Sequence, residues 1–249
     1  MANNELVTRG TAHWQLEPMW PLISTTIAFN ALIALGTGTN TVTALAVNGR
    51  GVRLTQDTNE AADLVLSGPI GFQANKTGLL TLRARVRINT TLTAAAFFIG
   101  FQDIITTGQL SYEDAAIVST PADGFGILYE SEQSLTQLYH IGVGNDVDDT
   151  IRITTNGDTI VLATFVTFDI EATSNNGTTG ADTGVVRYRV KQDGKILKSA
   201  GTNDQGWITS RCRSTVVLAP VLNLCGRATA HTFDTVEFYA DGAIGDTFD

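Results

Sequence analysis

The sequence predicts an all-β protein folded as an antiparallel β-sandwich. Apolar residues recur at every second position in many short runs, Gly, Asn, Asp or Pro separate the runs, and no comparable helical periodicity occurs. Charged residues make up only 16% of the 249 residues, whereas an average domain has about 25%. At this length one large sandwich with its own core needs neither disulfides nor metals.

The clearest half-buried strand is Leu80–Ile88, which reads LTLRARVRI. Its aliphatic side chains share one face, and the opposite face carries Thr81, Arg83, Arg85 and Arg87. One face of this strand should therefore lie in the core and the other in solvent.

A hairpin follows the second regular strand, Val185–Lys191, at Asp193-Gly194. An Asp-Gly pair favours a type I′ turn, because both central residues of that turn need positive φ. We expect Lys195–Ser199 to return antiparallel, with Leu197 opposite Val190.

The run Thr164–Ala172 places Val166, Phe168 and Ile170 on one face, and the polar segment 173–183 after it is typical of a long hairpin loop. Pairing Ala172 with Gly184 sets Ile170 against Val186 and Asp169 against Arg187. Burial and opposite charge both favour this register.

Ten more runs complete a set of about fourteen predicted strands, and no internal repeat is present. They are Val42–Val47, Gly51–Thr55, Ala62–Ser67, Ala95–Gln102, Gly124–Tyr129, Leu135–Val143, Thr150–Thr154, Thr159–Ala163, Thr215–Leu224 and Phe233–Ala240. Many short strands at this spacing indicate a sandwich or barrel.

Residues 1–41 differ from the sandwich domain predicted over 42–249. The segment His13–Pro21 holds Trp14, Trp20 and two prolines, which is unlike a regular strand. We interpret 1–41 as an irregular arm. Its two Trp residues either anchor a contact with a partner or close the end of the sandwich.

The net charge limits the partners that this protein can bind, and its apolar segments indicate its compartment. With 16 Lys and Arg against 25 Asp and Glu, the net charge is −9, which disfavours nucleic acid and anionic membranes. The apolar stretch Leu22–Leu35 is too short and too polar to span a bilayer. No signal peptide is evident, so we expect a protein made and kept in the cytoplasm.

Six basic residues are concentrated on the outward faces of two predicted strands: Arg83, Arg85, Arg87, Arg187, Arg189 and Lys191. Like charges side by side on a sheet are unfavourable unless acidic groups oppose them. These residues are candidates for binding a partner, together with Trp14 and Trp20. Alternatively they form a solvated strand face, opposed by an acidic row such as Asp169 and Glu171.

Catalytic and metal motifs are absent from the sequence. The three His residues lie in separate segments, and His140 sits in an alternating run typical of a packed strand. Asp146, Asp148 and Asp149 fit a solvated turn better than a calcium site, and Cys212 and Cys225 are expected to be reduced thiols. We therefore predict no catalytic residues, no metal, no cofactor and no enzymatic activity.

Five segments carry a resemblance to a known fold family. They are 79–87 (LLTLRARVR), 97–103 (FFIGFQD), 123–129 (DGFGILY), 185–194 (VVRYRVKQDG) and 233–239 (FDTVEFY). Their order resembles the concanavalin A-like (laminin G-like) jelly roll, and more narrowly the tailed-bacteriophage virion proteins that carry such a domain. Asp103 and Asp123 are the nearest counterparts of the loop residues with which some members bind calcium or glycans.

The resemblance implies a structural virion protein, a head decoration (cement) protein on the capsid surface. Its partners would be the major capsid protein and further copies of itself, with a trimer as the form that capsid symmetry suggests. The alternative is a lectin-like, carbohydrate-binding module of a phage fibre or receptor-binding protein. In that case Trp207, Tyr129 or Tyr139 would stack on sugar rings.

Overall fold

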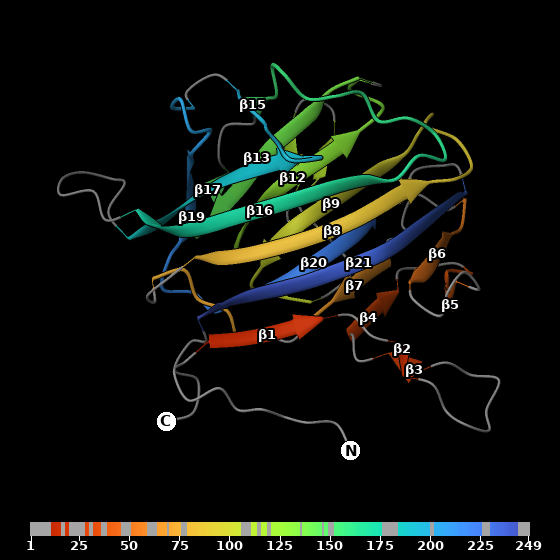
Figure 1. The fold of residues 1–249 in the computed structure, drawn as a ribbon, viewed down its shortest axis with the longest axis horizontal. Helices are drawn as coiled ribbons and strands as arrows, with labels where there is room; N and C mark the ends of the chain where they lie inside the picture. The colour runs from red at the N-terminus through yellow and green to blue at the C-terminus, as the bar shows by residue number, and fades with distance from the viewer. Residues whose placement is uncertain are drawn as a thin grey trace.

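Two antiparallel sheets, one in front of the other in Figure 1, form the body of the protein. The computed structural model describes residues 11–15, 18–19, 28–29, 32–35, 39–45, 51–58, 64–68, 70–75, 79–105, 111–113, 116–118, 121–134, 136–145, 147–148, 152–175, 184–199, 202–225 and 230–243. These residues contain 21 strands. None of them forms a helix long and apolar enough to cross a membrane.

The front sheet has nine strands. In spatial order seven of them are β18 (Lys195–Ile196), β17 (Val185–Gln192), β16 (Val166–Asn175), β8 (Leu80–Ile88), β21 (His231–Ala243), β6 (Val52–Gln56) and β5 (Thr41–Ala44). The remaining two are β1 (Thr11–Gln15), which pairs with β21, and β19 (Ile208–Arg213), which pairs with β17.

The rear sheet has eight strands. Their order is β14 (Val147–Asp148), β13 (Leu138–Gly144), β12 (Asp123–Glu130), β9 (Ala96–Gln102), β20 (Ala219–Cys225), β7 (Leu64–Ser67) and β4 (Leu32–Leu35), with β15 (Arg152–Ile153) also on β13. Two separate pairs are β2 (Pro18–Met19) with β3 (Ala28–Phe29), and β10 (Ser111–Glu113) with β11 (Ala116–Val118).

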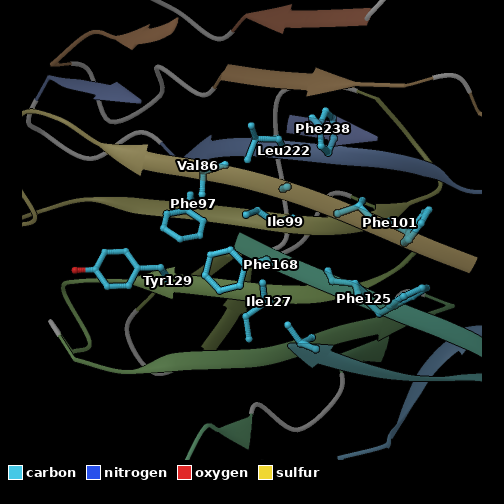
Figure 2. Packing of buried hydrophobic residues seen from close by; sticks show 14 of the residues in the cluster. Val86, Phe97, Ile99, Phe101, Phe125, Ile127, Tyr129, Phe168, Leu222 and Phe238 are labelled. Carbon is cyan, nitrogen blue, oxygen red and sulfur yellow. The ribbon is translucent and has the colours of Figure 1, made fainter. Parts of the chain in front are cut away.

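The main core lies between the two sheets and is rich in aromatic rings (Figure 2). Phe97 of β9 lies 5.4 Å from the Tyr129 ring of its own sheet, and 6.0 and 5.3 Å from the Phe168 and Phe233 rings of the facing sheet. Contacts of this kind tie the sheets together, because aromatic pairs add to the free energy of area burial.

The central strands of the rear sheet are buried on both faces. Every residue of β9, β12 and β13 is buried, and a second apolar cluster around Phe98 and Leu128 lies on the side away from the main core. Gly100 and Gly126 are adjacent in register, and the Phe98 ring lies close over both. Strands buried on both faces lose the period-two pattern, whereas β8 of the front sheet keeps it.

The predicted fold class, an all-β antiparallel jelly-roll sandwich, is confirmed. β8 has the predicted bounds. The turn prediction also holds, since Asp193 and Gly194 have φ of 48° and 82° and the Leu197 amide donates to the Val190 carbonyl over 2.8 Å.

The predicted register of β16 on β17 is wrong by four residues. Ile170 lies opposite Val190 and Asp169 opposite Lys191, because β16 continues to Asn175 before the chain returns. An even slip leaves every side chain on its own face. Burial and charge sign therefore could not distinguish the two registers.

Some strands were also missed or misplaced. Residues 159–163 form no strand, whereas β19 was overlooked because its inward positions hold the small residues Ser210 and Cys212 beside Ile208. The interpretation of His13–Pro21 as irregular is wrong for its first part, because β1 pairs with β21 over five residues. β4, also within 1–41, pairs with β7. The domain boundary at 41 stays a prediction.

Replacing Gly126 with Ala should destabilise the fold by roughly 1–3 kcal/mol or more, because an added Cβ would lie 2.2 Å from the Ile99 carbonyl oxygen. Urea unfolding measures the change. Thr43→Ala on the exposed side of β5 is the control, and equal stability of the two variants would contradict the packing described.

Candidate functional site

Charges alternate in sign across five neighbouring strands of the front sheet. We call the outward side of β17, β16, β8, β21 and β6 the charged face. β17 and β8 each carry three basic residues, β16 between them carries two carboxylates, and β21 carries three before Arg53 of β6. Opposite charges on adjacent strands attract, and this strand order supplies them at every step.

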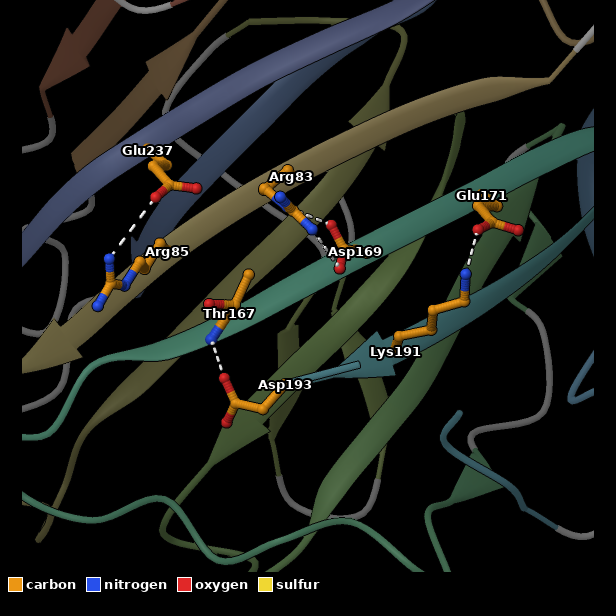
Figure 3. A network of polar contacts seen from close by, with 8 residues as sticks. All are labelled: Arg83, Arg85, Thr167, Asp169, Glu171, Lys191, Asp193 and Glu237. Atoms are coloured by element: carbon orange, nitrogen blue, oxygen red, sulfur yellow. Dashed lines mark hydrogen bonds and ion pairs between the residues drawn. The ribbon is translucent and has the colours of Figure 1, made fainter. Parts of the chain in front are cut away.

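Ion pairs connect these strands (Figure 3). The Arg83 guanidinium donates to both Asp169 oxygens, at 2.5 and 3.1 Å. Arg85 lies 3.6 Å from the Glu237 carboxylate. Glu171 accepts from Lys191 at 2.5 Å and from Arg189 at 2.6 Å. The bidentate ion pair between Arg83 and Asp169 fixes the position of β8 relative to β16.

Asp234 is the most deeply buried charge of this face, with a fully buried side chain. It accepts from Arg53 at 2.8 and 3.1 Å and from Arg87 at 3.0 Å. Burial opposes ionisation of Asp234, but hydrogen bonds from Arg53 and Arg87 outweigh it and lower its pKa. A buried carboxylate held by two arginines stabilises only while it is ionised.

The pKa of Glu171, a carboxylate closer to the surface, is set by the same two opposing effects. Desolvation favours its neutral form, yet hydrogen bonds from Lys191 and Arg189 lower its pKa overall. One carboxylate is thus shared by two of the three basic residues of β17. The third, Arg187, lies opposite Thr173 of β16 and Thr209 of β19.

The six basic residues predicted to point outward do lie on one face, on two strands separated only by β16. The predicted opposing acidic row of Asp169 and Glu171 is confirmed by the ion pairs. The predicted pairing of Asp169 with Arg187 is wrong, since Asp169 binds Arg83. The partner-binding role of these residues stays a prediction.

The sequence pattern predicts a strand over Phe233–Ala240 but does not reveal which of its acidic residues face outward. A β-bulge lies between Thr235 and Glu237. The extra residue lets Asp234 and Glu237 both face outward although they are three positions apart. A strict period of two would place them on opposite faces.

Two adjacent rows of outward side chains run across the strands and line a hollow of about 270 Å³. The register aligns Tyr239, Arg83, Asp169 and Lys191 in the first row, and Asp241, Thr81 and Glu171 in the second. Arg189 continues the second row on β17. Donors and acceptors therefore alternate along the hollow.

An aromatic ring lies at the β17 end of these rows. The Arg189 and Arg187 guanidinium carbons lie 4.8 and 5.1 Å from the centre of the partly exposed Trp207 ring. The Asn203 side chain accepts from the Trp207 amide at 3.1 Å and from the Gln205 amide at 3.0 Å, so the loop that carries the ring is tied down. The Arg85 and Arg87 guanidinium carbons lie 5.2 and 4.5 Å from the centre of the Phe165 ring in the same way.

The prediction that Tyr129 or Tyr139 stacks on a sugar is wrong, because both rings are buried. Burial is the main cause that raises the pKa of Tyr129 to about 12, and the negative charge of the nearby Glu130 adds to it. Of the three aromatic residues proposed, Trp207 alone is partly exposed. Trp14 lies on β1 opposite Ala240, and Trp20 lies outside the described residues.

The candidate metal-binding residues do not form a site in the described part of the chain. Asp123 is fully buried and accepts from the backbone amide and guanidinium of Arg213. Burial raises the pKa of Asp103. No group of three or more His, Cys, Asp or Glu that could hold a metal ion occurs among the described residues. Asp146 and Asp149 lie outside them.

No protein-family model matches this sequence. No curated protein matches it either. Solved structures do match. A protein of unknown function from Shewanella oneidensis MR-1 is 14% identical over 96% of this chain and 89% of its own, with a TM-score of 0.56. The potassium-bound carbohydrate recognition domain of Emp46p is 7% identical over 86% and 88%, with a TM-score of 0.52.

A third similar structure corrects the prediction of a non-enzymatic protein. The alginate lyase vAL-1 from a Chlorella virus is 10% identical over 86% of this chain and 93% of its own, with a TM-score of 0.51. Identities this low show the fold alone. Because an enzyme and a carbohydrate recognition domain share that fold, the missing sequence motifs do not rule out catalysis.

Asp234→Asn should lower the free energy of unfolding by about 2–3 kcal/mol at neutral pH, because Arg53 and Arg87 lose their shared buried counter-charge. Chemical denaturation measures the change. Asp158→Asn breaks the exposed pair with Lys195 and should cost less than about 0.5 kcal/mol. Equal losses in the two variants would contradict this account.

Acid should weaken the native protein through the same group. The pKa of Asp234 is lower in the folded state, so its contribution is complete above about pH 4 and is lost as the pH falls through the folded value. The wild-type melting temperature should drop more steeply below pH 4 than that of Asp234→Asn. Parallel pH profiles would be inconsistent with this role.

Proposed function

We propose that this chain is a carbohydrate-binding protein with a lectin-like binding surface on the charged face. The observation that carries the proposal is the polar hollow beside Trp207. Side chains from β21, β8, β16 and β17 converge there. Ion pairs and hydrogen bonds already hold most of them in place.

The chemistry of the hollow fits a sugar. Arg83 and Lys191 offer fixed N–H donors, and Asp169, Glu171 and Asp241 offer acceptors. Sugar hydroxyl groups both donate and accept, and hydrogen bonds to charged groups are the stronger kind. A partly exposed indole adds an apolar surface with a polar edge, suited to the C–H face of a sugar ring. That the carbohydrate recognition domain of Emp46p has the same fold supports the proposal.

A glycan array should identify a ligand, and calorimetry should measure its affinity. Trp207→Ala should weaken binding about 10- to 100-fold, as the loss of a central aromatic contact does. Ile70→Ala removes a more exposed apolar side chain, 48% exposed, that is not among the residues lining the hollow, and this variant should bind as the wild type does. Absence of any glycan ligand, or equal binding by both variants, would refute the proposal.

The second candidate is a head decoration protein of a tailed phage, which binds the major capsid protein lattice. Its support is the sequence resemblance, whose five segments overlap strands β8, β9, β12, β17 and β21 of the sandwich. In this role the protein would be an oligomer on the capsid surface of the virion. The outward basic residues and the N-terminal Trp residues would make the contacts.

Co-sedimentation with purified phage capsids tests the second candidate. A decoration protein should pellet with capsids at a fixed stoichiometry and raise their resistance to heat. Simultaneous replacement of Arg83, Arg85 and Arg87 by Ser should weaken that association, whereas Lys198→Gln, which changes an exposed residue after β18, should not. Glycan binding without capsid binding would decide against it.

A further inference from the structure

The carboxylates of β16 neutralise only part of the positive charge on β17. Arg187, Arg189 and Lys191 lie on one side of this strand, and Glu171 serves both Arg189 and Lys191. Asp169, the other β16 carboxylate, accepts hydrogen bonds from Nε and Nη2 of Arg83. No ion pair among the described residues involves Arg187, which leaves excess positive charge at this end.

The excess is local, and it stands out against the rest of the chain. The five strands of the charged face hold seven basic and five acidic residues, a net charge of +2. The remainder of the chain then holds nine basic and 20 acidic residues, a net charge of −11. The charged face therefore attracts an anion more strongly than the remainder of the chain does on average.

The register also gives the site a direction. The two rows that line the hollow run across β21, β8, β16 and β17, and Trp207 precedes β19, the next strand beyond β17. Four strand spacings of about 4.8 Å amount to roughly 19 Å. A band of that length, with the hollow along β21, β8, β16 and β17 and the Trp207 ring beyond β17, fits a chain of several sugar rings.

We infer that the ligand of the charged face is an acidic polysaccharide that lies across the strands, with an anionic group held by Arg187 beside Trp207. The inference rests on the proposed carbohydrate-binding function and specifies its ligand class. Arg187 is exposed and opposed only by threonines in register. Its guanidinium is positioned by the Trp207 ring, so little side-chain freedom is lost when it binds an anion.

Polygalacturonate and its fully methyl-esterified form are the probes, because they share a backbone and differ in charge. The wild-type protein should bind the acid form more tightly by about tenfold or more, the contribution of one charge-assisted hydrogen bond. Arg187→Gln should abolish that preference, because the variant lacks the cation that holds the anionic group. Lys198→Gln removes the same charge from an exposed position outside the rows and should keep the preference.

The outcomes separate this inference from the proposed function. Equal binding of acid and ester by the wild type would overturn the inference and leave the carbohydrate-binding function standing. Failure of every glycan, neutral or acidic, would overturn both. Equal losses in Arg187→Gln and Lys198→Gln would indicate non-specific charge attraction and overturn the inference. Stronger binding of a single-stranded oligonucleotide than of polygalacturonate would overturn it in favour of nucleic acid.

Discussion

Alternation of charge across neighbouring strands is the constraint on which the front sheet depends. Three basic residues in a row on β8 and again on β17 could not lie side by side without mutual repulsion. β16 separates the two strands and supplies carboxylates to both, and β21 with its buried Asp234 does the same on the other side of β8. The strand order that packs the core also neutralises the surface.

The same constraint creates the candidate site. Because ion pairs fix most outward side chains, the charged face presents donors and acceptors in set positions. A surface organised in this way before a ligand arrives loses little side-chain entropy on binding. Among the described residues of the five strands, the alternation is incomplete at the β17 edge, where Arg187 meets threonines and an indole ring. The positive charge left at this edge is the feature on which the proposed binding surface depends.

How far the sequence predicts the structure depends on the element. β8 alternates cleanly, so its bounds and its two faces follow from the residues alone. The β16 register could not be predicted, since a slip of four residues preserves both burial and charge pairing. Because of the bulge in β21, a period of two does not predict that Asp234 and Glu237 lie on the same face. The buried rings of Tyr129 and Tyr139 were misjudged because the rear sheet is covered on both faces.

The sequence by itself determined the fold class, the Asp193-Gly194 turn and the clustering of basic residues on two strands, because these depend on local periodicity and backbone preference. Tertiary structure alone decided which strands are neighbours, and therefore which carboxylate meets which arginine. It also brought Trp207 beside β17 and aligned the rows of the hollow. Contacts between residues far apart in the chain depend on strand order and register, to which the period of a single strand is insensitive.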